Sequence, residues 1–84
     1  MAFPNPVAGR MQQLSVRLPE LLGDKPVTVS LHDVSGVQLQ VLTTTASATP
    51  TVRFNVEGYA AGSYFVRVDD GHRYKVSDIV VLVR

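Results

Sequence analysis

Apolar and polar residues alternate one by one along most of the chain. In the first such run Leu14, Val16 and Leu18 are apolar, and Ser15 and Arg17 between them are polar. Successive side chains of a β-strand point to opposite faces, so a period of two predicts a strand with one buried face. Similar alternation recurs further along, in residues 27–32, 37–41, 52–56, 64–68 and 74–83. The pattern predicts six to seven short strands.

Turn residues separate these runs. The segment Asp33-Val34-Ser35-Gly36 predicts a hairpin turn, because the Asp33 carboxylate can bond to nearby backbone and Gly36 tolerates a positive φ. Asp70-Gly71 predicts a second hairpin with a type I′ turn. Residues 43–50 show no periodicity, so we expect this segment to cross from one sheet to another.

The closing segment carries two phases of alternation. Tyr74 and Val76 hold one phase, whereas Ile79 and Val81 hold the other. A strand that keeps one face buried cannot change phase without an irregularity, so we expect a bulge or a strand break at Ser77-Asp78.

Several apolar positions are assigned by their phase. Phe54 and Tyr64 each belong to a regular apolar alternation and are predicted to lie in the core. Val37, Leu39 and Val41 alternate with glutamines, as expected for a strand with one buried face. Tyr59 lies in a connection, and we expect it to cover the end of the core with its hydroxyl group in water.

The fold class follows from the spacing of these elements. No segment of ten or more residues has the apolar stripe of a helix, and residues 20–22 allow one helical turn at most. Short strands about 8–12 residues apart are typical of an all-β sandwich. With 84 residues the chain can enclose a single core, and 15 valines favour strands. The sequence predicts one all-β domain, a Greek-key sandwich of six to seven antiparallel strands spanning residues 1–84.

Composition and charge exclude several classes of function. A net charge of +1 gives no strongly basic face, so nucleic acid is not an expected partner. The absence of cysteine excludes disulfides and thiolate metal sites. No apolar run approaches the roughly 18 residues of a membrane span, so we expect no transmembrane segment. The first ten residues lack a basic start and contain two prolines, unlike a signal peptide.

The residues able to do chemistry are few. His32 and His72 are far apart in the sequence, and no serine lies in a G-x-S-x-G motif. A sandwich of this size has little room for a water-excluding pocket, so we predict that the domain is not an enzyme and needs no cofactor. A calcium site requires six to eight oxygen ligands at set spacing, and Asp69 and Asp70 are only two neighbouring carboxylates. A polar turn explains them equally well, and weak metal binding there is left open.

Three parts of the sequence, in this order, resemble one known family. They are an opening Phe3-Pro4-Asn5-Pro6-Val7, a hairpin in residues 27–36, and a closing half in residues 58–68, 74–76 and 79–81. The family is the type A C-terminal sorting domain of cargo proteins exported by the bacterial type IX secretion system. The resemblance runs over residues 3–84, which is nearly the whole chain.

This resemblance implies an immunoglobulin-like sandwich at the C-terminus of a larger secreted protein, with a cargo domain before it in the same chain. The domain would be a non-enzymatic signal, read by the outer-membrane translocon after the cargo reaches the periplasm. A sortase would then remove the domain, leaving the cargo at the cell surface or outside the cell. An adhesion or carbohydrate-binding sandwich fused to an enzyme is the alternative that the residues leave open.

The closing strand is the segment in which we expect the secretion machinery to make contact. Edge strands bind partners by strand addition, and residues 79–83 are apolar enough to form such an edge. Lys75 is expected on the polar face because Tyr74 and Val76 flank it. The side chains of Val80 and Val81 could equally complete the core. The full set of expected recognition residues is Gly62, Tyr64, Lys75, Ile79, Val80, Val81, Leu82, Val83 and Arg84.

Overall fold

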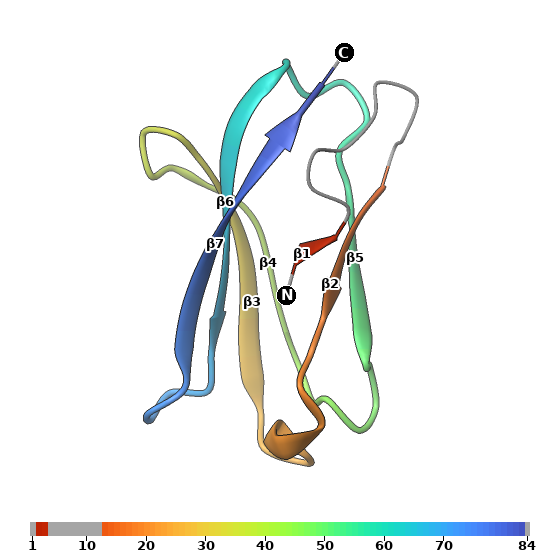
Figure 1. The fold of residues 1–84 in the computed structure, drawn as a ribbon. Coiled ribbons are helices and arrows are strands. Elements are labelled where there is room, and N and C mark those ends of the chain that lie inside the picture. Colours follow the sequence, from red (N-terminus) through yellow and green to blue (C-terminus); the bar gives the residue numbers. More distant parts are fainter. Residues whose placement is uncertain (1, 4–12, 84) are drawn as a thin grey trace.

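The computed structural model describes residues 2–3 and 13–83 (Figure 1). Within these ranges the chain forms seven strands and one short 3-10 helix, and β1 has only two residues. The strands are β1 (Ala2–Phe3), β2 (Gln13–Arg17), β3 (Val27–Asp33), β4 (Gln38–Thr44), β5 (Thr51–Asn55), β6 (Gly62–Asp69) and β7 (Lys75–Leu82). The helix η1 (Glu20–Leu22) supplies the single helical turn that the sequence allowed. Most of the Phe3-to-Val7 opening and Arg84 lie outside the described residues.

The strands form two antiparallel sheets that face each other. One sheet has the order β1-β2-β5 and the other has the order β4-β3-β6-β7. The segments that follow β2, β4 and β5 each pass from one sheet to the other, so β3 pairs with β6 and β2 pairs with β5. Such non-consecutive pairing makes the Greek-key connections of an immunoglobulin-like sandwich. The predicted all-β sandwich is confirmed, and so is the sheet-to-sheet crossing between β4 and β5.

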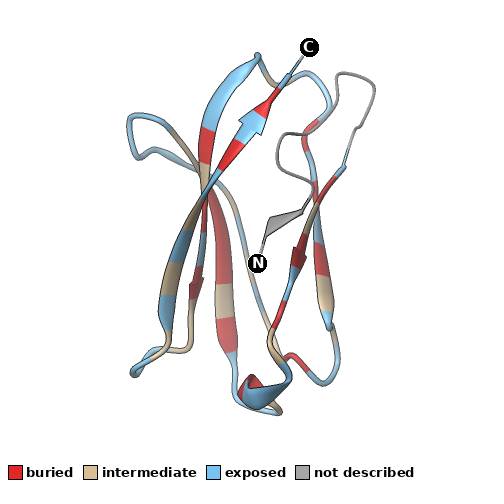
Figure 2. Cartoon of the chain, in the orientation of Figure 1, coloured by how far each residue is buried: buried red, intermediate tan, exposed pale blue. Residues whose placement is uncertain are grey.

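The core lies between the two sheets (Figure 2). Its buried apolar side chains are Leu14, Val16, Leu18, Leu22, Val27, Val29, Leu31, Ala46, Val52, Phe54, Val56, Tyr64, Val66, Val68, Val80 and Leu82. Phe54 and Tyr64 lie in this cluster as predicted. Each fully buried Val, Leu or Phe side chain stabilises the fold by roughly 1.5–3 kcal/mol relative to exposure. Tyr59 is only partly buried beside the core, and its hydroxyl accepts a hydrogen bond from Gln40 instead of facing only water.

The expected phase of β4 is wrong. Val37, Leu39 and Val41 are 57%, 39% and 49% exposed, and the alternate residues Gln40 and Leu42 are more buried. The register between β3 and β4 shifts after Leu31, so the pairing of these strands contains a bulge. Val41 then lies opposite Ser30 and shares its outward face. Pairing with β3 therefore decides the phase, and the local pattern of β4 does not.

The irregularity expected at Ser77-Asp78 is also absent, because β7 pairs with β6 in one constant register from Lys75 to Leu82. Val80 and Leu82 point into the core, whereas Ile79 and Val81 are 54% and 38% exposed. The strand is therefore continuous, and its outward face is apolar.

The two predicted hairpin turns differ in outcome. In the first, the Asp33 carboxylate accepts hydrogen bonds from the backbone N–H groups of Ser35 and Val37, and Gly36 has a φ of 94°, as expected. The second hairpin is present, but it has no type I′ turn, because no residue other than glycine has a positive φ in the described chain. It is a wider loop between β6 and β7, in which the Asp70 carboxylate accepts the N–H groups of His72 and Tyr74.

These turn carboxylates predict a loss of stability in acid. Hydrogen bonds from Ser35 and Val37 lower the pKa of Asp33 below its ordinary 3.8. The His72 and Tyr74 N–H groups similarly lower the pKa of Asp70. A group whose pKa is lower in the folded state binds fewer protons there than in the unfolded state. Its stabilisation is therefore fully present above about pH 4 and is lost as the pH falls through the lowered pKa.

Melting temperatures measured between pH 7 and pH 2 should show this decline. Replacing both Asp33 and Asp70 by asparagine should flatten it, since asparagine keeps the turn acceptor without the titration. Asp24→Asn is the control substitution, because Asp24 is an exposed aspartate outside these two turns. A double variant that declines as steeply as the parent chain would contradict the assignment.

Candidate functional site

One side of the four-stranded sheet faces away from β2 and β5 and presents the residues that alternate with the core positions. Cross-strand pairing places these residues in rows, so that Ser30, Arg67 and Ser77 form one row. His32, Phe65 and Ile79 form the next row. We call this surface the outer sheet face. It consists of Thr28, Ser30, His32, Gln38, Val41, Thr43, Ser63, Phe65, Arg67, Asp69, Lys75, Ser77, Ile79 and Val81.

The recognition residues expected from the sequence divide between this face and the core. Lys75, Ile79 and Val81 lie on the outer sheet face and are exposed, which for Lys75 is as predicted. Val80 and Leu82 are buried at 0% and 3% exposure. Of the two side chains whose role the sequence left open, Val80 completes the core and Val81 does not.

The remaining members of the expected set have different surroundings. Tyr64 is buried, and its hydroxyl donates a hydrogen bond of 2.7 Å to the Ala60 carbonyl oxygen, so it closes the end of the core. Gly62 begins β6 with a φ of 145°, a conformation that favours glycine. Val83 is 48% exposed just beyond the end of β7, and Arg84 is outside the described residues.

An apolar strip runs along β7 on the outer sheet face. Ile79 lies opposite Phe65 and Val81 lies opposite Ser63, so the strip also includes the partly buried Phe65 ring. Among the strands of residues 2–3 and 13–83, β7 stands at one end of the order β4-β3-β6-β7. The alternation alone could not reveal this strip, because residues 79–83 are all apolar and do not specify which of them face outwards.

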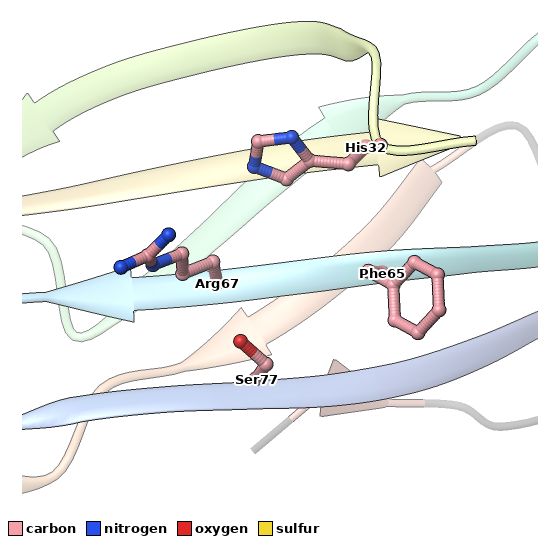
Figure 3. Close-up of a pocket in the computed structure, with 5 residues that line it drawn as sticks. His32, Phe65, Arg67 and Ser77 are labelled. Carbon is pink, nitrogen blue, oxygen red and sulfur yellow. The ribbon is translucent and has the colours of Figure 1, made fainter. Parts of the chain in front are cut away.

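Beside this strip the outer sheet face is polar and hollowed (Figure 3). A hollow of about 270 Å³ is lined by His32, Gly36, Phe65, Arg67 and Ser77. The His32 ring is held by a 2.8 Å hydrogen bond between its Nε2 and the Ser30 hydroxyl. Sequence inspection missed this arrangement because its residues come from separate strands and meet only through the register of the sheet.

Other candidate chemistry is confined to local structure. The Asp69 carboxylate accepts the Gly71 N–H at 2.7 Å, so both adjacent aspartates hold the loop between β6 and β7. Among residues 2–3 and 13–83, no group of three or more His, Cys, Asp or Glu side chains could hold a metal ion.

Burial raises the pKa of the Tyr74 phenol, and the negative charge of Asp78 adds to the shift, so this tyrosine stays neutral. In the described part of the chain, no helix has the length and apolar character needed to cross a membrane.

Comparison with known families decides what this sandwich is. A family model described as "Secretion system C-terminal sorting domain" matches residues 1–82. The chain belongs to this family. The family is that of type IX secretion sorting domains, and such domains act as signals for export to the cell surface or the extracellular space. A search of curated proteins found no match to this sorting domain.

Proposed function

We propose that this sorting domain is a non-enzymatic address, read in its folded state by the type IX outer-membrane translocon in the periplasm. In this proposal residues 1–84 form a single domain at the end of a larger protein, and a cargo domain precedes them. A surface sortase then removes the domain. The family match over residues 1–82 is the observation that carries the proposal. A signal of this kind needs an exposed, rigid surface and no reactive centre.

The outward residues of β7 are the contacts that we propose for the translocon. Ile79 and Val81 offer exposed apolar area on an edge strand, and Lys75 adds a charge at the start of the same strand. Val83, which is 48% exposed just beyond the strand, adds to this contact, and Arg84 completes the proposed set. The other members of the proposed set act indirectly, because they hold β6 and β7 in the folded shape that the translocon recognises. These residues are Gly62, Tyr64, Val80 and Leu82.

A reporter fusion tests the proposal. A periplasmic reporter followed by this domain should reach the surface of a type IX-competent cell, and the Lys75→Ala fusion should reach it several-fold less. Replacing an exposed lysine changes stability by no more than about 0.5 kcal/mol, so the melting temperature should stay the same. Lys25→Ala, which removes the other lysine of the chain from an exposed loop, is the matched control and should export normally.

Three readouts separate the outcomes. Normal export of Lys75→Ala would remove Lys75 from the contacts. Failure of the intact domain to export the reporter, in a cell that still secretes its own cargo, would contradict the address and favour a binding module. Recovery of the surface reporter at its full fused length would contradict removal by a sortase.

A further inference from the structure

Arg67 stands between two small residues on the outer sheet face. Ser30 of β3 lies opposite it on one side, and Ser77 of β7 lies opposite it on the other. Because neither serine can fill the space beside a long side chain, a hollow remains on each side of Arg67. One is the hollow of about 270 Å³ described above, and the other has a volume of about 260 Å³. His32 and Arg67 line both.

The Arg67 guanidinium has N–H donors that can bind a ligand. Its closest charged partner is Asp69, with 3.6 Å between the Arg67 Nη2 and the Asp69 Oδ2. That separation is too long for a hydrogen bond, and the Arg67 side chain is 50% exposed. Within residues 13–83 the five N–H groups of this guanidinium donate no hydrogen bond. The Asp69 carboxylate therefore forms an ion pair with the Arg67 cation, and the guanidinium keeps N–H donors for a second carboxylate.

His32 is the second fixed group of the site. Its hydrogen-bond partner Ser30 is only 5% exposed, so the ring is anchored to a buried hydroxyl and not to a mobile surface group. Figure 3 shows His32, Phe65, Arg67 and Ser77 projecting from the same side of the sheet. A guanidinium, an imidazole and a hydroxyl thus surround one hollow, with an aromatic ring at its border.

We propose that this hollow binds the carboxylate of an aspartate or glutamate in an extended segment of a protein partner. The planar guanidinium fork of arginine matches a carboxylate, which can accept two parallel hydrogen bonds from it. The hollow is smaller than the roughly 300–1,000 Å³ of pockets that enclose a whole small molecule. It therefore fits a single side chain better than a complete free ligand.

The surroundings of the hollow favour a protein as the source of the carboxylate. Phe65 lines the hollow and lies opposite Ile79, so the apolar strip begins where the polar hollow ends. Arginine and aromatic residues are enriched at protein–protein interfaces, where they lie beside apolar surface. An extended segment with an acidic residue beside an apolar one complements both parts of the outer sheet face. This site does not depend on the translocon contacts proposed for β7 and is tested without secretion.

Nuclear magnetic resonance of the ¹⁵N-labelled 84-residue chain tests the site. The probe is the peptide acetyl-Val-Thr-Asp-Thr-Val-amide, and its matched control carries asparagine in place of aspartate. The aspartate peptide should cause saturable shifts in the amides of His32, Phe65, Arg67 and Ser77. The asparagine peptide and the Arg67→Gln variant should each bind about fivefold more weakly, which corresponds to the upper end of the energies of exposed ion pairs. The shifts should also weaken as sodium chloride is added, since salt screens exposed charges.

Arg53→Gln is the control variant, because Arg53 is an exposed arginine in the middle of a strand of the other sheet. It should bind the aspartate peptide as the parent chain does. Equal binding of the two peptides, or unchanged binding by Arg67→Gln, would overturn the proposal. A third titration uses glucuronate. If glucuronate shifts the same amides at lower concentration than the aspartate peptide, the hollow is an acidic-sugar site and the protein partner is rejected.

Discussion

Phe54→Ala should cost about 3–5 kcal/mol of the free energy of unfolding. Phe54 is 2% exposed and lies on β5 directly opposite Leu14 of β2, with Val52 and Val56 on the same inward face. Removing the ring leaves a cavity that the two sheets cannot close without disturbing their pairing. A domain of this size is expected to have about 4–13 kcal/mol in total, so the loss would be a large share of its stability.

Urea unfolding followed by circular dichroism measures this loss. Phe65→Ala is the matched control, since Phe65 is the same residue type on the outer sheet face and is only partly buried. Its cost should be clearly smaller. A loss below about 1 kcal/mol for Phe54→Ala, or equal losses for the two variants, would mean that the inward and outward faces are assigned wrongly.

The largest effect on export is expected from the outward residues of β7. Replacing both Ile79 and Val81 by threonine keeps a β-branched side chain in the strand but removes apolar surface from the strip. Ile79→Thr removes an ethyl group and Val81→Thr removes a methyl group. At roughly 0.8 kcal/mol for each of these three carbon groups when buried, their loss weakens a contact by about fiftyfold. Export of the fused reporter should fall to a similar degree, whereas the melting temperature of the double variant should change little.

Two further threonine variants separate recognition from folding. Val80→Thr places a hydroxyl in the core at a site with 0% exposure, so it should lower the melting temperature, because an unsatisfied buried hydroxyl costs about 1–3 kcal/mol. Val41→Thr is the matched outward control on β4, with Val41 49% exposed, and should leave both export and melting unchanged. Normal export of the Ile79 and Val81 double variant would remove the apolar strip from the recognition surface.

The phase of several strands was readable from the sequence alone. In β2, β5 and β6 the inward residues are apolar and most outward ones are polar, as with Val52 and Phe54 around Arg53. A slip by one residue would bury the charged side chain, so one phase is strongly preferred. The same contrast between neighbours explains why the exposure of Lys75 was predictable. The turn at Asp33 was also readable, because its bonds reach only nearby residues.

The register of the four-stranded sheet was decided by tertiary structure. Residues 79–83 are apolar at every position, so no local contrast says that Val80 turns inwards and Ile79 outwards. The bulge after Leu31 likewise reverses the expected phase of β4.

The row formed by Ser30, Arg67 and Ser77 exists only once three separate strands are paired. The alternation of apolar and polar residues indicates which residues of a single strand lie on each of its two faces. It carries no information about which residues of other strands lie beside them, and the hollow around Arg67 depends on those neighbours. The sequence alone thus determined the fold class, the core strands and the family, while strand pairing determined the composition of the outer sheet face.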